Sequence, residues 1–284
     1  MWYPIPSIVM TIPDKKSSVF PHALGNDGHI FFRGRGLPDA LLVNLSILLS
    51  NPGSRSNDVV SMKILGINAS PKGKESQTLR LVNSVLRGAE SEGAETEIID
   101  LYSLHIEYCT ACGECYATGE CPLVDDYPEL FDRMIDADAI VLGSPNYIDS
   151  ITAPLKAVFD RMADAIHCQM LSGKYGCSVC TAGGSGQMEV VKYMNQVLTS
   201  LGATAVGGVG VAIGRDLSAI VQAEKDAFSL GQRLAQSVRG EHRYPEQDEI
   251  HRQRREYFCR LITLNKTRWA HEYDWWVEKG EIRR

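Results

Sequence analysis

The densest group of reactive side chains in this sequence is a run of four cysteines within thirteen residues, Cys109, Cys112, Cys115 and Cys121, with Pro122 after the last. Two gaps of two residues let one compact turn present three thiolates to three corners of a cubane, and the fourth thiolate completes the coordination. The spacing is close to the ferredoxin run C-x2-C-x2-C-x3-C-P. Structural zinc also accepts four cysteines, usually as two separated C-x2-4-C pairs. The run therefore favours a [4Fe-4S] cluster over zinc or an empty thiol loop.

The other four cysteines follow a different pattern. Cys177 and Cys180 form a C-x2-C pair inside an apolar run. Side chains alternate between the two faces of a strand, so we expect these two to be core thiols and not ligands. Cys168 and Cys259 are isolated, and the sequence assigns them no role. The uneven crowding of eight cysteines indicates metal or redox chemistry rather than a disulfide framework.

The polar loop after the first apolar run could bind an anion. It combines hydroxyl groups at Ser70, Ser76 and Thr78 with a lysine and the free backbone amides of a helix start, which suits a phosphate monoester. It is not a nucleotide P-loop, because G-x4-G-K-[ST] aligned on Gly73 and Lys74 would need glycine at position 68 and Ser or Thr at position 75. An ordinary helix with Ser76 as its N-cap would have the same residues, so the loop alone leaves both interpretations open.

Two further loops could contact a ligand. Residues 143–156 offer an aromatic side chain, several hydroxyls and amides held by two prolines, which suits a flat heteroaromatic ring. Residues 181–187 carry no bulky side chain, so a ligand could approach the backbone closely. Either loop could be simple turn chemistry. The segment Gly208–Gly214 is similar to a dinucleotide-binding G-x-G-x-x-G, but Ile213 stands where the last glycine is needed, so no fixed NAD(P) domain is indicated.

These loops must be positioned by the elements around them, and from Met62 short apolar runs alternate with helical patterns. The predicted strands are residues 63–68, 97–101, 139–143, 176–180 and 205–211, and the predicted helices are residues 79–89, 153–165, 190–201 and 220–238. Most of these strands are apolar on both faces, which predicts an α/β fold with a parallel sheet covered on both sides. Such sheets bind ligands at the carboxyl ends of their strands, so we expect chemistry in the loops after the first, third and fourth strands.

The chain divides into three regions. Residues 1–61 contain six of the twelve prolines, no cysteine and no sustained periodicity, which is typical of a poorly ordered extension. A second interpretation, equally open, is that Met62 is the true start. Residues 62–240 form the predicted globular domain. Residues 241–284 hold three of the four tryptophans, and we expect a helical arm that packs its aromatic side chains on the body or on another subunit rather than against a ligand.

Composition excludes several classes of function. The 284 residues have a net charge of -6, and no dense Lys/Arg block occurs before the last fifty residues, so we expect no nucleic-acid partner. The longest apolar stretch, residues 40–49, is interrupted by Asn44 and Ser46 and is about half of the roughly 20 residues that a membrane span needs. The first ten residues lack the basic region of a secretory signal. These features predict a cytoplasmic protein with no membrane segment.

Residues 62 to about 238 resemble the flavodoxin-like NADPH-dependent FMN reductase superfamily. The residues that carry the resemblance are Met62–Pro71 with Ser76 and Thr78, and Gly143–Tyr147 through Ala153–Lys156. The compact cysteine run makes the chain similar to the archaeal-type iron-sulfur flavoprotein branch. The resemblance implies a doubly wound, five-stranded parallel sheet of flavodoxin type, flanked by an irregular N-terminal extension and a helical C-terminal arm.

The resemblance also implies an FMN site. It places the phosphate on Ser70, Lys72, Ser76, Gln77 and Thr78, the ring against Pro145, Asn146, Tyr147 and Ser150, and further contacts at Ala182, Gly183 and Gly184. Position 72 is often arginine in the family, and lysine there keeps the charge but loses the bidentate fork.

Together these patterns favour an FMN and [4Fe-4S] electron-transfer flavoprotein, an oxidoreductase that accepts electrons singly through the cluster and pairs them on the flavin. No side chain is assigned as a catalytic acid, base or nucleophile. The implied partners are a ferredoxin-like redox protein or a small-molecule acceptor, NAD(P)H as a transient donor, and further copies of the chain in a homodimer or homotetramer. Two alternatives stay open: an NAD(P)H-dependent FMN or quinone reductase with a structural Cys loop, and a non-catalytic flavin- or zinc-binding redox regulator.

Overall fold

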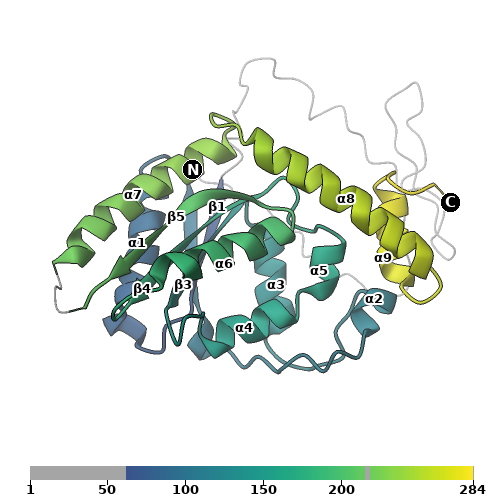
Figure 1. The fold of residues 1–284 in the computed structure, drawn as a ribbon, viewed down its shortest axis with the longest axis horizontal. Helices are drawn as coiled ribbons and strands as arrows, with labels where there is room; N and C mark the ends of the chain where they lie inside the picture. Colours follow the sequence, from purple (N-terminus) through teal and green to yellow (C-terminus); the bar gives the residue numbers. More distant parts are fainter. Residues whose placement is uncertain (1–61, 215–217, 284) are drawn as a thin grey trace, which may run out of the picture. The chain divides into compact units, whose positions relative to one another are not determined.

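A five-stranded parallel sheet forms the centre of the computed structural model, which describes residues 62–214 and 218–283. The strands are β1 (Lys63–Asn68), β2 (Glu95–Asp100), β3 (Ala139–Pro145), β4 (Tyr175–Ala182) and β5 (Thr204–Ala212). Their order is β2-β1-β3-β4-β5 (Figure 1), so the chain reverses direction across the sheet between β1 and β3. This is the flavodoxin-like doubly wound order, and it confirms the predicted fold class. The predictions about residues 1–61 lie outside the described residues.

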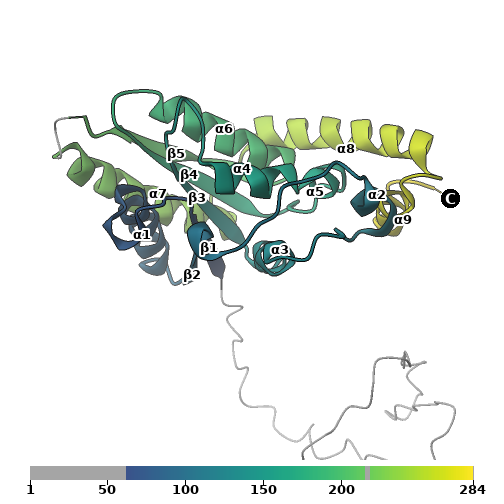
Figure 2. The same ribbon diagram turned by 90° about the horizontal axis from the view of Figure 1, so that it is seen from below.

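Helices cover both faces of the sheet (Figure 2). They are α1 (Gln77–Glu90), α2 (Glu114–Thr118), α3 (Tyr127–Asp136), α4 (Ala153–Asp160), α5 (Ala163–His167), α6 (Gln187–Ser200), α7 (Ala219–Val238), α8 (Pro245–Asn265) and α9 (Ala270–Glu278), with short 3-10 turns η2 (Gly73–Glu75) and η3 (Leu101–Ser103). One apolar cluster joins α1 and α7 to the sheet, and a second joins α3, α4 and α6 to it. Cys177 lies in the first cluster and Cys180 in the second, both fully buried, so the prediction of core thiols is confirmed.

Helices α1 and α7 meet backbone to backbone. A Cβ atom added at Gly231 would lie 1.8 Å from the carbonyl oxygen of Val85, and one added at Gly88 would lie 2.0 Å from that of Phe228. No side chain fits at either distance, so the two glycines set how closely these helices pack.

The predicted helix 153–165 is divided into α4 and α5 at Arg161 and Met162. Both residues are buried, and the bend turns Arg161 toward the segment that follows the cysteine run. The periodicity of apolar residues continues through the bend, and for this reason the sequence pattern predicted a single helix.

Helix α3 was not predicted. It starts with Pro128 in its first turn, where proline is well tolerated, and it buries Leu130 and Met134 four residues apart on one face. Its ten residues carry several charges, which hide this short apolar stripe.

The C-terminal region is helical, as predicted, and it packs its aromatic side chains on the body. The indole N–H of Trp275 donates to the carbonyl oxygen of Cys168 at 2.8 Å, and that of Trp276 donates to the carbonyl oxygen of His167 at 3.2 Å. Both acceptors lie at the C-terminal end of α5. Across the described ranges, the structure contains no helix of the length and apolarity that a membrane span requires.

Candidate functional site

The loops after β1, β3 and β4 meet at the carboxyl edge of the sheet. The hydroxyl groups of Thr78 and Thr181 share a hydrogen bond of 2.7 Å, which joins the start of α1 to the end of β4. The backbone N–H of Asn146 donates to the carbonyl oxygen of Thr181 at 2.7 Å, and the Asn146 amide donates to the carbonyl oxygen of Ser185 at 2.7 Å. The structure therefore brings the three predicted ligand loops to one edge.

At the start of α1, the side chain of Ser76 serves as the N-cap. Its hydroxyl oxygen accepts a hydrogen bond from the backbone N–H of Leu79 at 3.0 Å. A hydroxyl group that accepts one hydrogen bond can still donate another, so this geometry is compatible with both interpretations of the loop. Lys72 is exposed and Gln77 is partly buried beside the same helix start, where backbone N–H groups and the helix dipole favour an anion.

Thr78 lies deeper than the sequence pattern suggested. Its side chain is buried, and its hydroxyl group pairs with Thr181 between α1 and β4. A phosphate contact from Thr78 stays a prediction, and it would require this hydroxyl group to share its hydrogen bond with the ligand.

The loop after β3 ends in a tight, strained turn. Tyr147 and Ser150 exchange backbone hydrogen bonds of 2.9 and 3.2 Å, and the two residues between them, Ile148 and Asp149, have φ values of 51° and 57°. This left-handed pair is the hairpin turn that glycine and asparagine favour, and a β-branched isoleucine adopts it only with strain. Ile148 is 100% exposed at the tip. Such strain is concentrated at binding sites, which agrees with the predicted position of the flavin ring beside this turn.

The polar groups at this edge fit a flavin. Both side-chain polar atoms of Asn68, which is fully buried at the end of β1, lack a hydrogen-bond partner, and so does the side-chain oxygen of Asn146. A Cβ atom added at Gly183 or Gly184 would meet nothing within 4 Å, so the loop after β4 faces open space. Unpaired amide groups beside an open glycine backbone suit a flat ring with donors and acceptors along its edge.

The cysteine run belongs to a long loop whose two ends are joined. The backbone N–H of His105 donates to the Asp126 carboxylate at 2.7 Å, and the Asp126 N–H donates back to the carbonyl oxygen of His105 at 3.0 Å. The backbone N–H of Glu107 donates to the Asp125 carboxylate at 2.6 Å. Residues 108–124 are therefore held as a closed loop, with all four cysteines inside it.

Arg161 fastens the base of this loop to the body. Its guanidinium donates to both carboxylate oxygens of Asp125, at 2.6 and 3.3 Å, and to the carbonyl oxygen of Glu107 at 3.1 Å. The Arg161 and Asp125 side chains are only 1% and 0% exposed, and the guanidinium lies 4.4 Å from the centre of the Tyr127 ring. The same guanidinium interacts with the Cys121 thiol.

This pair also sets the ionisation of Asp125. Burial opposes its charge, but hydrogen bonds from Arg161 and from the backbone N–H groups of Glu107 and Tyr127 outweigh burial and hold the pKa of Asp125 below its usual range. Sequence reasoning missed both Arg161 and Asp125. Acidic residues are common after any loop, and no local pattern shows that Arg161 would be buried.

The four thiols of the run are free and unevenly exposed. Cys109 and Cys112 are exposed, whereas Cys115 on α2 and Cys121 are partly buried. Burial, followed by the negative charges of Asp164 and Cys121, raises the pKa of the Cys115 thiol to about 11. A bound metal would have to stabilise this thiolate.

In the described part of the chain, the four thiols of the run do not converge on one point, as a single tetrahedral ion would require. A tetrahedral zinc site with bonds of about 2.3 Å would bring its sulfur atoms to about 3.8 Å of one another. Among residues 62–214 and 218–283, no three of the four sulfur atoms lie within 4.8 Å of one another. A cubane binds each thiolate through a different iron atom, so it does not require the sulfur atoms to meet at one point.

The C-terminal arm covers part of the cysteine loop, and α9 lies beside α2 in both views (Figures 1 and 2). The Tyr116 ring of α2 stacks on His167 at 4.9 Å and contacts Trp269 at 5.2 Å. His271 of α9 lies so close to Gly119 that a Cβ atom there would be 2.6 Å from its ring. The arm thus packs on the body, as expected, and at the same place it holds the cluster loop.

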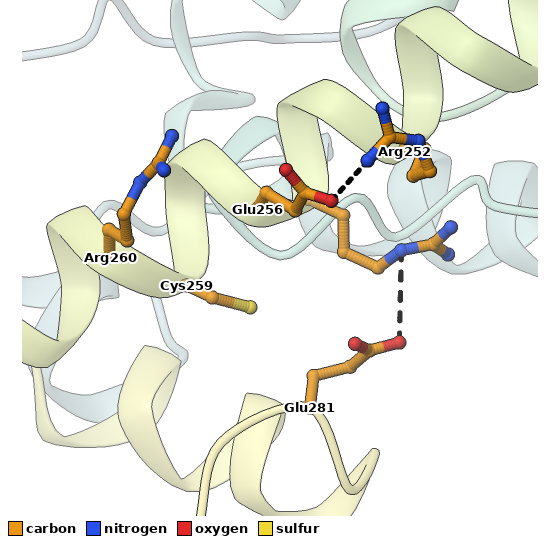
Figure 3. A pocket seen from close by; sticks show the side chains of 6 residues that line it. Arg252, Glu256, Cys259, Arg260 and Glu281 are labelled. Atoms are coloured by element: carbon orange, nitrogen blue, oxygen red, sulfur yellow. Dashed lines mark hydrogen bonds and ion pairs between the residues drawn. The ribbon is translucent and has the colours of Figure 1, made fainter.

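A separate pocket of about 480 Å³ lies on α8 and the segment after α9 (Figure 3). Its lining residues are Arg252, Arg255, Glu256, Cys259, Arg260 and Glu281. Arg252 pairs with Glu256, and Arg255 pairs with Glu281 at 3.7 Å, so most of its charge is compensated. None of these residues belongs to the predicted flavin or cluster set.

Comparison with known proteins gives matches that include the sheet and its ligand loops. Residues 62–218 match the family model described as NADPH-dependent FMN reductase. An iron-sulfur flavoprotein of Archaeoglobus fulgidus is 36% identical over 234 residues, which cover 78% of this chain and 100% of that protein. An iron-sulfur flavoprotein of Methanocaldococcus jannaschii is 41% identical over 100 residues, 35% of this chain and 51% of that protein.

Among solved structures, a flavone reductase superposes with a TM-score of 0.53 at 20% sequence identity, over 63% of this chain and 63% of that one. At this identity the match concerns the fold alone.

Proposed function

Because this chain belongs to the NADPH-dependent FMN reductase family, and to its iron-sulfur flavoprotein branch, we propose that it is a flavin-dependent oxidoreductase that binds FMN and a [4Fe-4S] cluster and passes electrons between them. The cluster supplies single-electron chemistry, and the flavin supplies both one- and two-electron chemistry. The observation that carries the proposal is the closed four-cysteine loop with its buried Arg161–Asp125 anchor. An FMN reductase without a cluster has no need of such a loop.

The carboxyl edge of the sheet is the proposed FMN site. The N-terminus of α1, with Ser70, Lys72, Ser76, Gln77 and Thr78, would hold the phosphate, because the helix start offers N–H donors and the lysine a positive charge. The ring would lie between the strained turn after β3 and the open glycines after β4. The unpaired amide groups of Asn68 and Asn146 support this orientation.

The cluster would be held by Cys109, Cys112, Cys115 and Cys121. The loop that carries them contacts the body beyond the C-terminal end of α4, whereas the N-terminal end of α4 follows the flavin edge. Eight residues of helix span about 12 Å at 1.5 Å per residue, so a cluster in the cysteine loop and a flavin at the sheet edge would be held near opposite ends of α4.

This separation gives a second subunit a role in electron transfer between cluster and flavin. A homodimer or homotetramer would bring the cluster of one subunit toward the flavin of another, with the exposed turn at Ile148 as a contact. The exposed side of the loop, at Cys109 and Cys112, would be open to a ferredoxin-like protein that delivers single electrons. The eight free thiols fit a reducing compartment such as the cytoplasm.

Spectra of the anaerobically purified protein test the proposal. Flavin bands with the broad absorption of an iron-sulfur cluster support it. Flavin bands alone would favour the NAD(P)H-dependent FMN or quinone reductase, in which the Cys loop is structural. If neither appears, a non-catalytic role is favoured.

A matched pair of variants locates the cluster. Cys112→Ser should lose iron and keep FMN, because a hydroxyl group is a poor replacement for a thiolate ligand. Cys259→Ser on α8, outside the loop, should keep both. If Cys112→Ser retains its iron and acid-labile sulfide, the assignment of the loop is wrong.

A further inference from the structure

A second group of metal-binding side chains lies beside the cysteine loop but comes from other elements. Asp164 is on α5 and Cys168 is at its C-cap, so a separation of four residues places them on one helix face. His271 comes from α9. One ligand atom of each residue lies within 4.8 Å of those of the other two, which is true of no other group of three in the described part of the chain.

The distances suit a small cation. The Asp164 carboxylate lies 3.8 Å from the Cys168 sulfur and 3.7 Å from His271 Nε2. Tetrahedral zinc, with bonds of about 2.0 Å to nitrogen and oxygen and 2.3 Å to sulfur, separates its ligand atoms by about 3.3–3.8 Å. The third pair, Cys168 and His271, has its ligand atoms within 4.8 Å of each other, so the side chains would have to move closer together to bind the ion.

The electrostatics of the group favour a cation. Asp164 and Cys168 are buried, and Glu272, which is fully buried, is hydrogen-bonded to His167 and raises the pKa of Asp164. Burial and the neighbouring Glu272 carboxylate raise the pKa of Asp164 to about 7. His271 Nε2 is buried without a hydrogen-bond partner. Buried charges are normally paired or coordinate a metal, and here two carboxylates face one another with His167 as the ion-pair partner of Glu272.

We propose that Asp164, Cys168 and His271 bind a zinc ion that is separate from the cysteine run. The mixed oxygen, sulfur and nitrogen donors are those of zinc, whereas magnesium and calcium prefer oxygen alone. Burial raises the pKa of the Cys168 thiol, and a coordinating divalent cation removes that proton.

The role of this zinc would be structural. It would join α5 to α9 and hold His271 against Gly119, inside the cysteine loop. Zinc carries no electrons, so the site would brace the cluster loop without taking part in redox chemistry.

The test uses the full chain, purified anaerobically, incubated with zinc chloride and then dialysed. Zinc and iron are counted by mass spectrometry, and the zinc environment is read from X-ray absorption at the zinc edge. We expect about one zinc per chain, with one sulfur at about 2.3 Å and nitrogen or oxygen ligands at about 2.0 Å. Four sulfur ligands would place the zinc in the cysteine run and overturn the proposal, as would zinc at background level.

Two variants complete the test. His271→Ala should lose the zinc and keep its iron, and because His271 is partly exposed the variant is expected to fold. Cys168→Ser should do the same, whereas Cys259→Ser should keep both metals. Retention of zinc by His271→Ala would refute the site whatever the other variant does. Iron content reports on the proposed cluster independently, so failure of one proposal is distinguishable from failure of the other.

Discussion

Replacing Arg161 with methionine should destabilise the protein strongly, because it leaves the Asp125 carboxylate as a buried charge without its partner. The Asp125 side chain is 0% exposed, and the variant removes both of its contacts with the guanidinium together with the bond to the carbonyl oxygen of Glu107. Breaking a buried ion pair from one side costs about 3–5 kcal/mol. The free energy of unfolding of a typical domain is about 5–15 kcal/mol, so Arg161→Met would remove a large part of the stability.

Two companion variants separate charge from geometry. Arg161→Lys keeps the positive charge but loses the two-pronged contact, so we expect a smaller loss of about 1–2 kcal/mol. The double variant Arg161→Met with Asp125→Asn removes both charges and keeps one amide oxygen, which can accept from the N–H group of Glu107 or of Tyr127 but not from both, since these two groups bond different oxygens of Asp125. The double variant should therefore be more stable than Arg161→Met alone.

The pH dependence has a defined sign. The pKa of Asp125 is lowered in the folded state, so its contribution to stability is complete above its unfolded pKa of about 3.9 and is lost as the pH falls through the folded value. The stability difference between wild type and Asp125→Asn should therefore shrink below about pH 4. Anaerobic urea denaturation, followed by circular dichroism, measures all of these differences. The stabilising role of the Arg161–Asp125 ion pair would be refuted if Arg161→Met reduced the free energy of unfolding by less than about 1 kcal/mol, or if the double variant were no more stable than Arg161→Met.

Other features give shorter predictions. Replacing Ser76 and Thr78 together with alanine should weaken FMN at least about tenfold while sparing riboflavin, because lost charge-assisted hydrogen bonds cost about 1.5–3 kcal/mol each; equal weakening of both flavins in a fluorescence titration would show that the loop only caps the helix. Gly231→Ala should destabilise the protein by about 1–3 kcal/mol in thermal unfolding, because the added methyl group would collide with the backbone of α1; in most helices the same change stabilises. Ser229→Ala, on the exposed face of α7, should not destabilise it. A chain that starts at Met62 should fold and retain FMN, since every predicted cofactor loop lies after it; a flavin-free product would show that the predicted domain boundary is wrong.

The sheet was predictable because its signal is local. β1 was predicted residue for residue, since a short apolar run bounded by polar residues is sufficient to identify a buried strand. The three ligand loops followed from the rule that parallel strands present their carboxyl ends at one edge. β2 was predicted two residues late because it lies at the edge of the sheet and is largely exposed, so its apolar pattern is weak.

The parts that sequence reasoning missed depend on contacts between distant residues. Arg161 and Asp125 are 36 residues apart, and neither has a neighbour in sequence that shows it will be buried. Glu272 meets His167 across 105 residues, and its burial follows only from the packing of α9 on α5. The hydrogen bond between Thr78 and Thr181 could not be predicted for the same reason, since Thr181 lies in β4, 103 residues along the chain from Thr78 in α1.

Transfer of electrons from the cluster to the flavin is the central claim, and its most direct test is anaerobic rapid mixing of the FMN-loaded protein with a reduced ferredoxin while the flavin bands are followed. The account predicts that the wild-type flavin is reduced quickly and that the flavin of iron-free Cys112→Ser is reduced far more slowly. Equal rates in the two proteins, with fast reduction of both by NAD(P)H, would contradict the account and identify the chain as a simple flavin reductase.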